Sequence, residues 1–261
     1  MYVFVLSIHR SLGARLVTKI LSLNIWGGRR LESLLSYIDA MRDVDIICLQ
    51  EVFGLHVTPF AQLDAQDCAS VYDKLIEALP DHQAFFCPIV DSSYGLAAFI
   101  KSKYSVLRHE RHLIHRCQPG SGHGLFHDRA LQLLDVTIGG QNMQVMNIHG
   151  LVNGRGKTDS SSRLEQTRAI LSLVGLDDKP TILLGDFNLT LNTDCIALIE
   201  RQFTNLVRQY SIQSTRSAFY RKPDRYADYI FLSPQLRCID FAVPDHDVSD
   251  HLPLLCSFTS D

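Results

Sequence analysis

The chain has 261 residues, 46% of them apolar, and a formal net charge of −3. A chain of this length and composition can bury one sizeable core, and it is compatible with a single domain. The slightly negative charge gives no general attraction to long nucleic acid, so it disfavours a processive or non-specific DNA-binding enzyme.

Predicted strands and helices alternate along the chain, which favours an α/β layered fold. Apolar runs predict strands at 19–25, 44–49, 83–88, 95–100, 129–138, 142–148, 181–184, 226–232, 237–243 and 252–258. Helical spacing predicts helices at 30–41, 69–79, 161–174 and 192–202. Gly139 and Gly140 separate two strands and predict a hairpin. The histidine-rich stretch 108–129 is expected to be a mobile loop on the substrate side.

The seven cysteines are scattered and odd in number, which argues for a reduced compartment rather than a disulfide framework. We therefore expect a cytoplasmic protein, without a stable membrane anchor because no run of eighteen apolar residues is present. We interpret residues 1–16 as an appendage and residues 17–261 as one domain. One hypothesis is that natural translation starts at the codon for Val17.

Polar side chains stand where several apolar strands begin or end, although a packed core would reject them. Asp186 and Asn188 follow the strand at 181–184, and Glu51 follows the strand at 44–49. The same pattern places polar groups at three further strand ends: Asn24, His149 and Asp228. Functional loops of α/β proteins gather at such positions.

Oxygen ligands of this kind select hard cations such as Mg²⁺ or Mn²⁺, while imidazoles and an amide suit the charge of a phosphoryl group. The set therefore predicts metal-assisted attack of water on phosphorus. Soft-metal and nucleophilic-serine chemistry have less support, because neither C-x-x-C, H-E-x-x-H nor G-x-S-x-G occurs.

Six short motifs combine these residues with their neighbours in a fixed order. They are Leu23-Asn24-Ile25-Trp26, Leu49-Gln50-Glu51, Asn147-Ile148-His149-Gly150-Leu151, Gly185-Asp186-Phe187-Asn188, Ala227-Asp228-Tyr229-Ile230 and Ser249-Asp250-His251. Together they resemble the endonuclease/exonuclease/phosphatase superfamily over nearly the whole chain. The resemblance implies a DNase I-like, four-layer αββα sandwich with its site at one rim of the paired sheets.

The resemblance also implies roles for the motif residues. The expected metal ligands, or residues that support them, are Asn24, Glu51 and Asp250, with Glu51 as the principal ligand. The expected catalytic residues are His149, Asp186, Asn188, Asp228 and His251.

Within this group, the resemblance implies that Asp228 fixes the tautomer of His251 and that His149 contacts the phosphate or assists the leaving oxygen. We expect Asp186 to orient or deprotonate the attacking water and Asn188 to donate to a phosphoryl oxygen. Either Asp186 or His251 can serve as the base.

Three arginines are candidate phosphate contacts because the guanidinium group carries a fork of donors. They are Arg129, Arg163 and Arg216. Two cationic loops, 153–159 and 214–223, are expected to determine the choice of substrate. In the second loop, Phe219 or Tyr220 is suited to stack on a base or to cover a lipid headgroup.

Trp26 stands where some nucleases of the superfamily carry an acidic residue, which disfavours an abasic-site nuclease and leaves the metal stoichiometry open. We interpret this tryptophan as a packing residue.

The leading interpretation is a Mg²⁺-dependent phosphodiesterase, with Mn²⁺ as an alternative metal and nucleic acid or a nucleotide-like compound as its substrate. One alternative is a phosphatase or a sphingomyelinase-type phospholipase. An alternative of another class is a non-catalytic phosphate-binding module.

Overall fold

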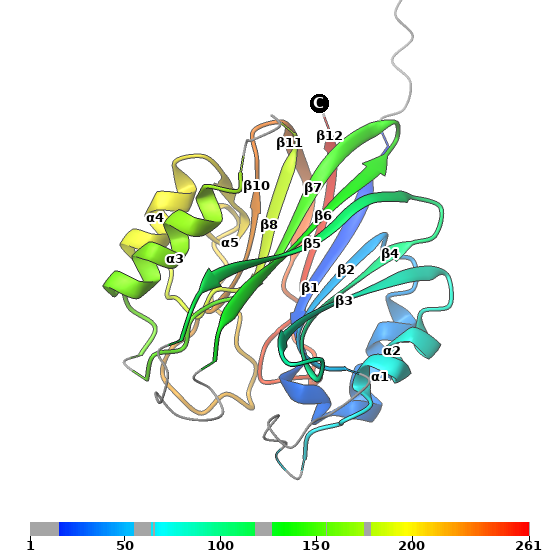
Figure 1. Ribbon diagram of the computed structural model, residues 1–261, viewed down its shortest axis with the longest axis horizontal. Helices are drawn as coiled ribbons and strands as arrows, with labels where there is room; N and C mark the ends of the chain where they lie inside the picture. Colours follow the sequence, from blue (N-terminus) through cyan, green and yellow to red (C-terminus); the bar gives the residue numbers. More distant parts are fainter. Residues whose placement is uncertain are drawn as a thin grey trace, which may run out of the picture.

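The computed structural model describes residues 16–54, 64, 66–117, 127–154, 156–174 and 179–260. Two six-stranded sheets lie face to face, and helices cover the outer side of each sheet (Figure 1). The expected four-layer αββα sandwich is confirmed. Of the expected appendage 1–16, only Leu16 lies within the described residues.

The first sheet has the strand order β11-β12-β1-β2-β4-β3. Its strands are β1 (Thr18–Asn24), β2 (Ile46–Phe53), β3 (His82–Val90), β4 (Tyr94–Lys101), β11 (Leu236–Ala242) and β12 (Leu254–Ser260). The short 3₁₀ helix η1 (Trp26–Gly28) and the helices α1 (Leu31–Ala40) and α2 (Val71–Ala78) belong to this half. β1 and β2 run parallel, and the other pairs are antiparallel.

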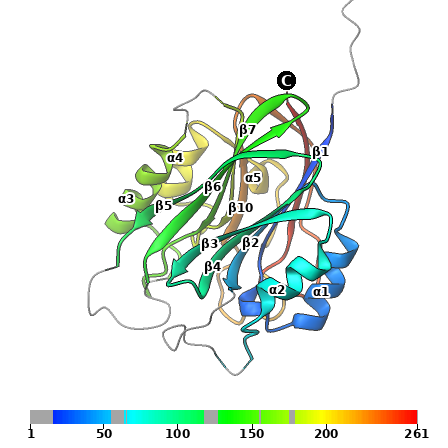
Figure 2. The ribbon, with the colours of Figure 1, turned by 45° about the vertical axis from the view of Figure 1, so that its right-hand side comes forward.

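The second sheet has the strand order β5-β6-β7-β8-β10-β9. Its strands are β5 (Ser105–His115), β6 (Arg129–Ile138), β7 (Gln141–His149), β8 (Thr181–Asp186), β9 (Thr204–Asn205) and β10 (Asp228–Leu232). The helices α3 (Ser161–Leu171), α4 (Asp194–Glu200) and α5 (Leu206–Gln209) cover this sheet on the side away from α1 and α2 (Figure 2). Within this sheet, β7 and β8 are the parallel pair.

Alternation along the central strands explains the layers, because successive side chains point to opposite faces of a sheet. In β1, Ile20 joins the core between the two sheets, whereas Leu21 and Leu23 pack with Leu34 and Leu75 of the helices. Both faces are therefore apolar, which accounts for the continuous apolar run in the sequence. No helix in the described part of the chain is both long and apolar enough to cross a membrane.

The histidine-rich stretch 108–129 differs from the expected mobile loop. Its first part belongs to β5, which pairs with β6 along its length at the edge of the second sheet. Side chains of β5 alternate between exposed and half-buried, and many are charged, so the two-residue period lacks the apolar face that usually reveals a strand. Charged side chains are common on edge strands because they discourage pairing with another chain. Residues 118–126 lie outside the described residues.

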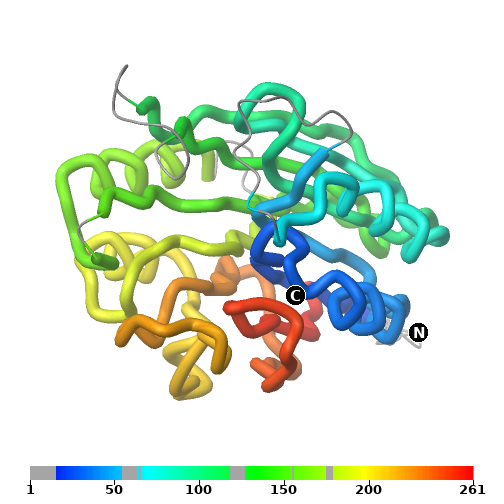
Figure 3. The backbone as a smooth tube through the Cα atoms, turned by 90° about the horizontal axis from the view of Figure 1, so that it is seen from below, coloured from blue at the N-terminus to red at the C-terminus, as the bar shows by residue number. Residues whose placement is uncertain are grey.

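Two parallel pairs, β1–β2 in one sheet and β7–β8 in the other, bring the polar strand ends together. The carboxyl ends of these strands reach the same rim of the sandwich, at the bottom of Figure 1. Figure 3 views the molecule from this rim, where the blue segment after β1 and the red segment before β12 lie side by side. Arg30 Nε accordingly donates to the carbonyl oxygen of Asp247, at 3.4 Å.

Candidate active site

Glu51 owes its position to an irregularity near the end of β2. The pairing with β4 shifts between Leu49 and Val52, and Glu51 adopts a φ of 58°. A non-glycine residue in this left-handed region is uncommon, and a bulge redirects the side chain that it carries. Asn24, at the end of the neighbouring strand, donates from Nδ2 to Glu51 Oε1 at 2.9 Å. The bulge thus places the Glu51 carboxylate at the rim beside Asn24.

The Gly-Asp-Phe-Asn segment depends on the close approach of β7 and β8. Gly185 has a φ of 129°, and a Cβ atom there would lie 2.2 Å from the carbonyl oxygen of Ile148. Only glycine fits this position. The resulting register sets His149 opposite Asp186. The backbone N–H of Asn188 then donates to Asp186 Oδ1 at 2.8 Å and fixes that carboxylate.

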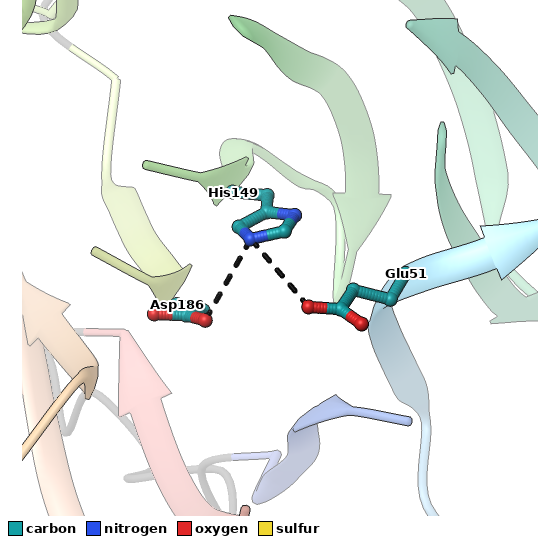
Figure 4. Close-up of side chains that lie close together, drawn as sticks. All are labelled: Glu51, His149 and Asp186. Atoms are coloured by element: carbon teal, nitrogen blue, oxygen red, sulfur yellow. Dashed lines mark ion pairs between the residues drawn. The ribbon is translucent and has the colours of Figure 1, made fainter. Parts of the chain in front are cut away.

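Glu51, His149 and Asp186 form the centre of the cluster (Figure 4). His149 Nε2 lies 3.7 Å from Glu51 Oε1 and 3.8 Å from Asp186 Oδ2. Asn24 Nδ2 bridges the two carboxylates, because it also donates to Asp186 Oδ2 at 3.1 Å. One potential ligand atom from each of the three residues lies within 4.8 Å of the others.

The charge states of these three groups fit a divalent cation. Burial raises the pKa of Glu51, against the opposing effects of Asn24 and His251. For Asp186, burial acts in the same direction but is outweighed by its cationic neighbours, His251, Lys157 and Arg216, so its pKa is lowered. Burial, reinforced by Arg129, lowers the pKa of His149 well below its usual value, so the ring is neutral.

A neutral imidazole between two carboxylates supplies no positive charge to balance them. His149 Nδ1 is also buried and has no hydrogen-bond partner among the described residues. Oxygen ligands with an imidazole at this spacing suit a divalent metal, which would relieve the repulsion between the carboxylates. The donor set therefore fits the cation that the sequence predicts.

His251 and Asp228 form a second, adjoining unit of the cluster. His251 Nδ1 lies 2.8 and 2.9 Å from the two Asp228 oxygens, and Thr215 Oγ1 donates to Asp228 Oδ2 at 3.0 Å. His251 Nε2 lies 3.6 Å from Asp186 Oδ2, so this unit adjoins the carboxylates. Burial and Arg216 lower the pKa of His251, but three carboxylates, led by Asp228, outweigh them and raise it.

Arg216 and Asp250 line the same part of the site. Arg216 Nη1 contacts His251 Nε2 and lies 3.3 Å from Asp250 Oδ2. With Nδ1–H directed at Asp228, Nε2 of the neutral ring accepts from the guanidinium. Asp250 Oδ1 has no hydrogen-bond partner among the described residues. Arg216 therefore adjoins the candidate catalytic residues, and Asp250 keeps one oxygen for a further contact.

The other two candidate arginines differ in position. Arg129 is fully buried at the start of β6, where its charge acts on His149, Glu51 and Asp186. Arg163 instead donates from Nη2 and Nε to the Leu151 carbonyl at 3.1 and 3.3 Å, and from Nη1 to the Thr158 carbonyl. The fork of donors on Arg163 thus braces the backbone, and its role as a phosphate contact stays a prediction.

Two residues that the sequence did not single out also belong to the site. Thr215 holds Asp228, and Lys157 Nζ lies 2.5 Å from Asn188 Oδ1. Both come from the two cationic loops, so their composition was an available signal. Which side chain turns inward was not visible in the sequence. Trp26 stacks against Phe219 with ring centroids 6.4 Å apart, which agrees with its interpretation as a packing residue.

Comparisons with known proteins agree with this geometry. The model of the endonuclease/exonuclease/phosphatase family matches residues 21–251. No curated protein sequence matches the chain significantly. Among solved structures, a family protein from Bacteroides thetaiotaomicron has a TM-score of 0.73 at 18% identity, covering 95% of this chain and 100% of that one.

Two further structures share the fold. The mannosyl-6-phosphatase of Bacteroides thetaiotaomicron VPI-5482 has a TM-score of 0.71 at 17% identity, with 93% and 99% of the two chains covered. The D. rerio TDP2 complexed with a single-strand DNA product has a TM-score of 0.68 at 20% identity, with 94% and 99% covered. Members of the matched family are in general phosphoester hydrolases. The chain belongs to the endonuclease/exonuclease/phosphatase family.

Proposed function

We propose that the chain is a Mg²⁺-dependent phosphodiesterase that acts on nucleic acid or a nucleotide-like compound, with Mn²⁺ as an alternative metal. The observation that carries the proposal is the convergence of Glu51, His149 and Asp186 beside the Asp228–His251 pair. Residues from four separate strands and from the segment before β12 meet there, which a purely structural arrangement of charges does not require.

The metal would be held by Glu51 as principal ligand, with Asn24 orienting its carboxylate. Asp250 offers a second carboxylate through its Oδ1, which lies 3.7 Å from His251 Nε2, and His149 lies between Glu51 and Asp186. When bound, the cation supplies positive charge to the phosphoryl oxygens as negative charge develops there.

Asp186 and His251 have different roles toward the attacking water. Asp186 has a lowered pKa and is therefore a weak base, which suits it to accept a hydrogen bond from the attacking water and to orient it. His251 has a raised pKa, and Asp228 fixes its Nδ1 proton, so Nε2 is the better proton acceptor.

Arg216 must release Nε2 before the ring can take this proton, because two donors would otherwise face each other. A phosphate anion offers the guanidinium an alternative, bidentate partner. Asn188 completes the phosphate site by donating from its amide to a phosphoryl oxygen. His149 remains neutral and contacts the phosphate or the leaving oxygen.

An activity screen with Mg²⁺ and with EDTA tests this proposal. The substrates are bis(p-nitrophenyl) phosphate, oligonucleotides, phosphomonoesters, inositol phosphates and sphingomyelin. We expect hydrolysis of the diester and of oligonucleotides with Mg²⁺, lost with EDTA and restored by added metal. Hydrolysis that is indifferent to EDTA, or none with any phosphoester, would contradict the proposal.

A phosphomonoesterase is the second candidate function. Three cations, Arg129, Lys157 and Arg216, act on the pocket, and a terminal phosphate carries more negative charge than a diester. One structural neighbour at a TM-score of 0.71 is a mannosyl-6-phosphatase. A higher kcat/KM for p-nitrophenyl phosphate than for the bis-ester would favour this candidate.

A further inference from the structure

Lys157 lies in a segment that is tied to its surroundings at three successive residues, through two backbone carbonyls and the carboxylate of Asp159. Thr190 donates to the Lys157 carbonyl from its backbone N–H at 2.8 Å and from Oγ1 at 3.2 Å. Arg163 donates to the carbonyl of Thr158. Asp159 accepts from the backbone N–H groups of residues 194 and 195, at 2.7 and 3.0 Å. The position of Lys157 is therefore imposed by the fold.

The side chain of Lys157 is buried next to the candidate catalytic residues. The residue is only 7% exposed, and its Nζ lies 2.5 Å from Asn188 Oδ1. Lysine is seldom buried unless it is paired, and the partner here is a neutral amide rather than a carboxylate. Confining this cation costs free energy that the amide only partly offsets.

The charges around Lys157 belong to the site itself. Burial, reinforced by Arg216, lowers the pKa of Lys157 to about 8, although Asp186, Asp228 and Asp224 favour the ammonium form. The ring of Tyr220 lies 5.9 Å from Nζ and 4.2 Å from the guanidinium carbon of Arg216. One aromatic ring thus adjoins two cations that interact with the carboxylates of the site.

The contact with Lys157 also sets the orientation of Asn188. An ammonium group only donates, so it selects the amide oxygen of Asn188 and turns Nδ2 to the other side. There Nδ2 has a long contact of 3.4 Å with the Gly150 carbonyl. Asn188 is itself held in the left-handed region with a φ of 53°. Such strain at a site is consistent with a side chain positioned for a ligand.

We propose that Lys157 is a phosphate-binding residue, whose ammonium contacts a phosphoryl oxygen and orients the Asn188 amide toward the same group. The proposal rests on the proposed function in one respect, that the ligand of the pocket is a phosphoester. The loop 153–159 then binds the phosphate directly, in addition to its expected role in the choice of substrate.

The test compares the binding of inorganic phosphate, measured by titration calorimetry in the presence of Mg²⁺, between the wild-type protein and Lys157 variants. Lys157→Met keeps the length of the side chain but removes the charge, and Lys157→Arg keeps the charge. We expect about a tenfold or larger increase in the phosphate dissociation constant for Lys157→Met, and a smaller increase for Lys157→Arg. Lys103→Met is the matched control, because Lys103 is an exposed lysine whose Nζ pairs with Asp45 at 2.9 Å.

Steady-state kinetics and thermal unfolding separate phosphate binding from a structural role. Lys157→Met should lower kcat/KM about a hundredfold while its melting temperature stays at or above that of wild type, because a buried cation has been removed. Methylammonium should restore part of the turnover of Lys157→Ala. A dissociation constant within twofold of wild type in Lys157→Met, or a wild-type protein that does not bind phosphate, would overturn the assignment.

The two proposals fail in different ways. If the wild type hydrolyses phosphoesters but Lys157→Met binds phosphate normally, only the role of Lys157 is wrong. If the wild type binds phosphate through Lys157 but hydrolyses no phosphoester, the role of Lys157 stands and the proposed activity is wrong.

Discussion

Two buried polar regions lie next to each other in this protein, and they are built on opposite principles. Between the sheets, side-chain amides contact one another: Gln50 donates to Asn147 at 2.8 Å, and Asn147 donates to Gln132 at 3.1 Å. We call Gln50, Gln132 and Asn147 the amide ladder. At the rim, the groups are charged, and carboxylates converge with imidazoles and with the cations Lys157 and Arg216.

The same short motifs supply both regions. Leu49-Gln50-Glu51 contributes Gln50 to the ladder and Glu51 to the rim, and Asn147-Ile148-His149 likewise contributes Asn147 and His149. Neutral amides that hydrogen-bond to one another stabilise a core, whereas desolvated carboxylates store free energy that a cation can release. The comparison indicates that each motif combines a stabilising residue with a functional one, so substitutions at adjacent positions should have different consequences.

The largest effect should follow from neutralising the rim. Glu51→Gln and Asp186→Asn should each lower kcat by about 10²–10⁴-fold, because each removes a charge that holds the cation or orients water. The fold should remain intact in both. The measurement is the rate at which the purified variants hydrolyse bis(p-nitrophenyl) phosphate. Near wild-type rates in either variant would contradict a functional role for the rim carboxylates.

Stability separates these two variants further. Burial raises the pKa of Glu51, so removal of its charge should leave the free energy of unfolding unchanged or raise it. Neighbouring cations lower the pKa of Asp186, so Asp186→Asn should reduce that free energy.

Substitutions in the amide ladder should reduce stability, whereas those at the rim chiefly reduce activity. Asn147→Leu removes the partner of both Gln50 and Gln132 and leaves their buried amides with fewer contacts. We expect a loss of about 2–5 kcal/mol in the free energy of unfolding, measured with urea. Asn142→Ala, on the exposed part of β7, is the matched control. A variant with normal stability but no activity would show that the ladder is not chiefly structural.

The next effect concerns pH and a neutral imidazole beside the rim. Burial, reinforced by Arg129, lowers the pKa of His127 to about 3, and the ring packs edge-on against Tyr94. Below about pH 6.5 the unfolded chain binds a proton that the folded ring refuses, so stability falls as the pH decreases from 6.5 towards 3. In this range, each unit of pH decrease lowers the free energy of unfolding by about 1.4 kcal/mol.

His127→Asn keeps a side-chain donor and removes this titration. Between pH 7 and pH 5, the free energy of unfolding, measured with urea, should decrease by about 2 kcal/mol less in the variant than in the wild type. Asn142→Ala, on the exposed part of β7, is the control, because it removes no titratable group and should leave the wild-type pH dependence unchanged. If the free energy of unfolding of His127→Asn depends on pH as it does in the wild type, His127 is not the group that causes this dependence.

The smallest effect should come from the aromatic side of the pocket. Phe219 stacks with Trp26, and the guanidinium carbon of Arg30 lies 4.7 Å from its ring centroid. Phe219→Ala should raise KM about fivefold for a substrate with a stacking base, because one aromatic face is lost. A substrate with an aliphatic leaving group should show no change, and kcat should stay constant for both. Equal changes in KM for the two substrates would contradict stacking of a base on Phe219.

The rim was predictable from the sequence because polar residues next to buried strands stand out. Asn24, Glu51, His149 and Asp186 each follow an apolar run, and the structure brings them together. The four layers came from the resemblance, since periodicity by itself indicates only mixed α/β structure.

The remaining features depend on tertiary contacts that a sequence pattern does not contain. β5 lacks an apolar face because it is an edge strand, so it resembles a polar loop. Lys157 turns inward because Thr190 and Asp159 anchor its loop. Arg163 carries the same donors whether it binds a phosphate or a backbone carbonyl, and the fold decides between them.

The most direct test of the central claim is the binding of Mn²⁺, followed by electron paramagnetic resonance, in the wild-type protein and in Glu51→Gln. We predict that the wild type binds Mn²⁺, that Mg²⁺ competes with it, and that Glu51→Gln binds it about 10–100-fold more weakly. Equal affinity in the two proteins, or no binding by the wild type, would contradict a metal site at this rim.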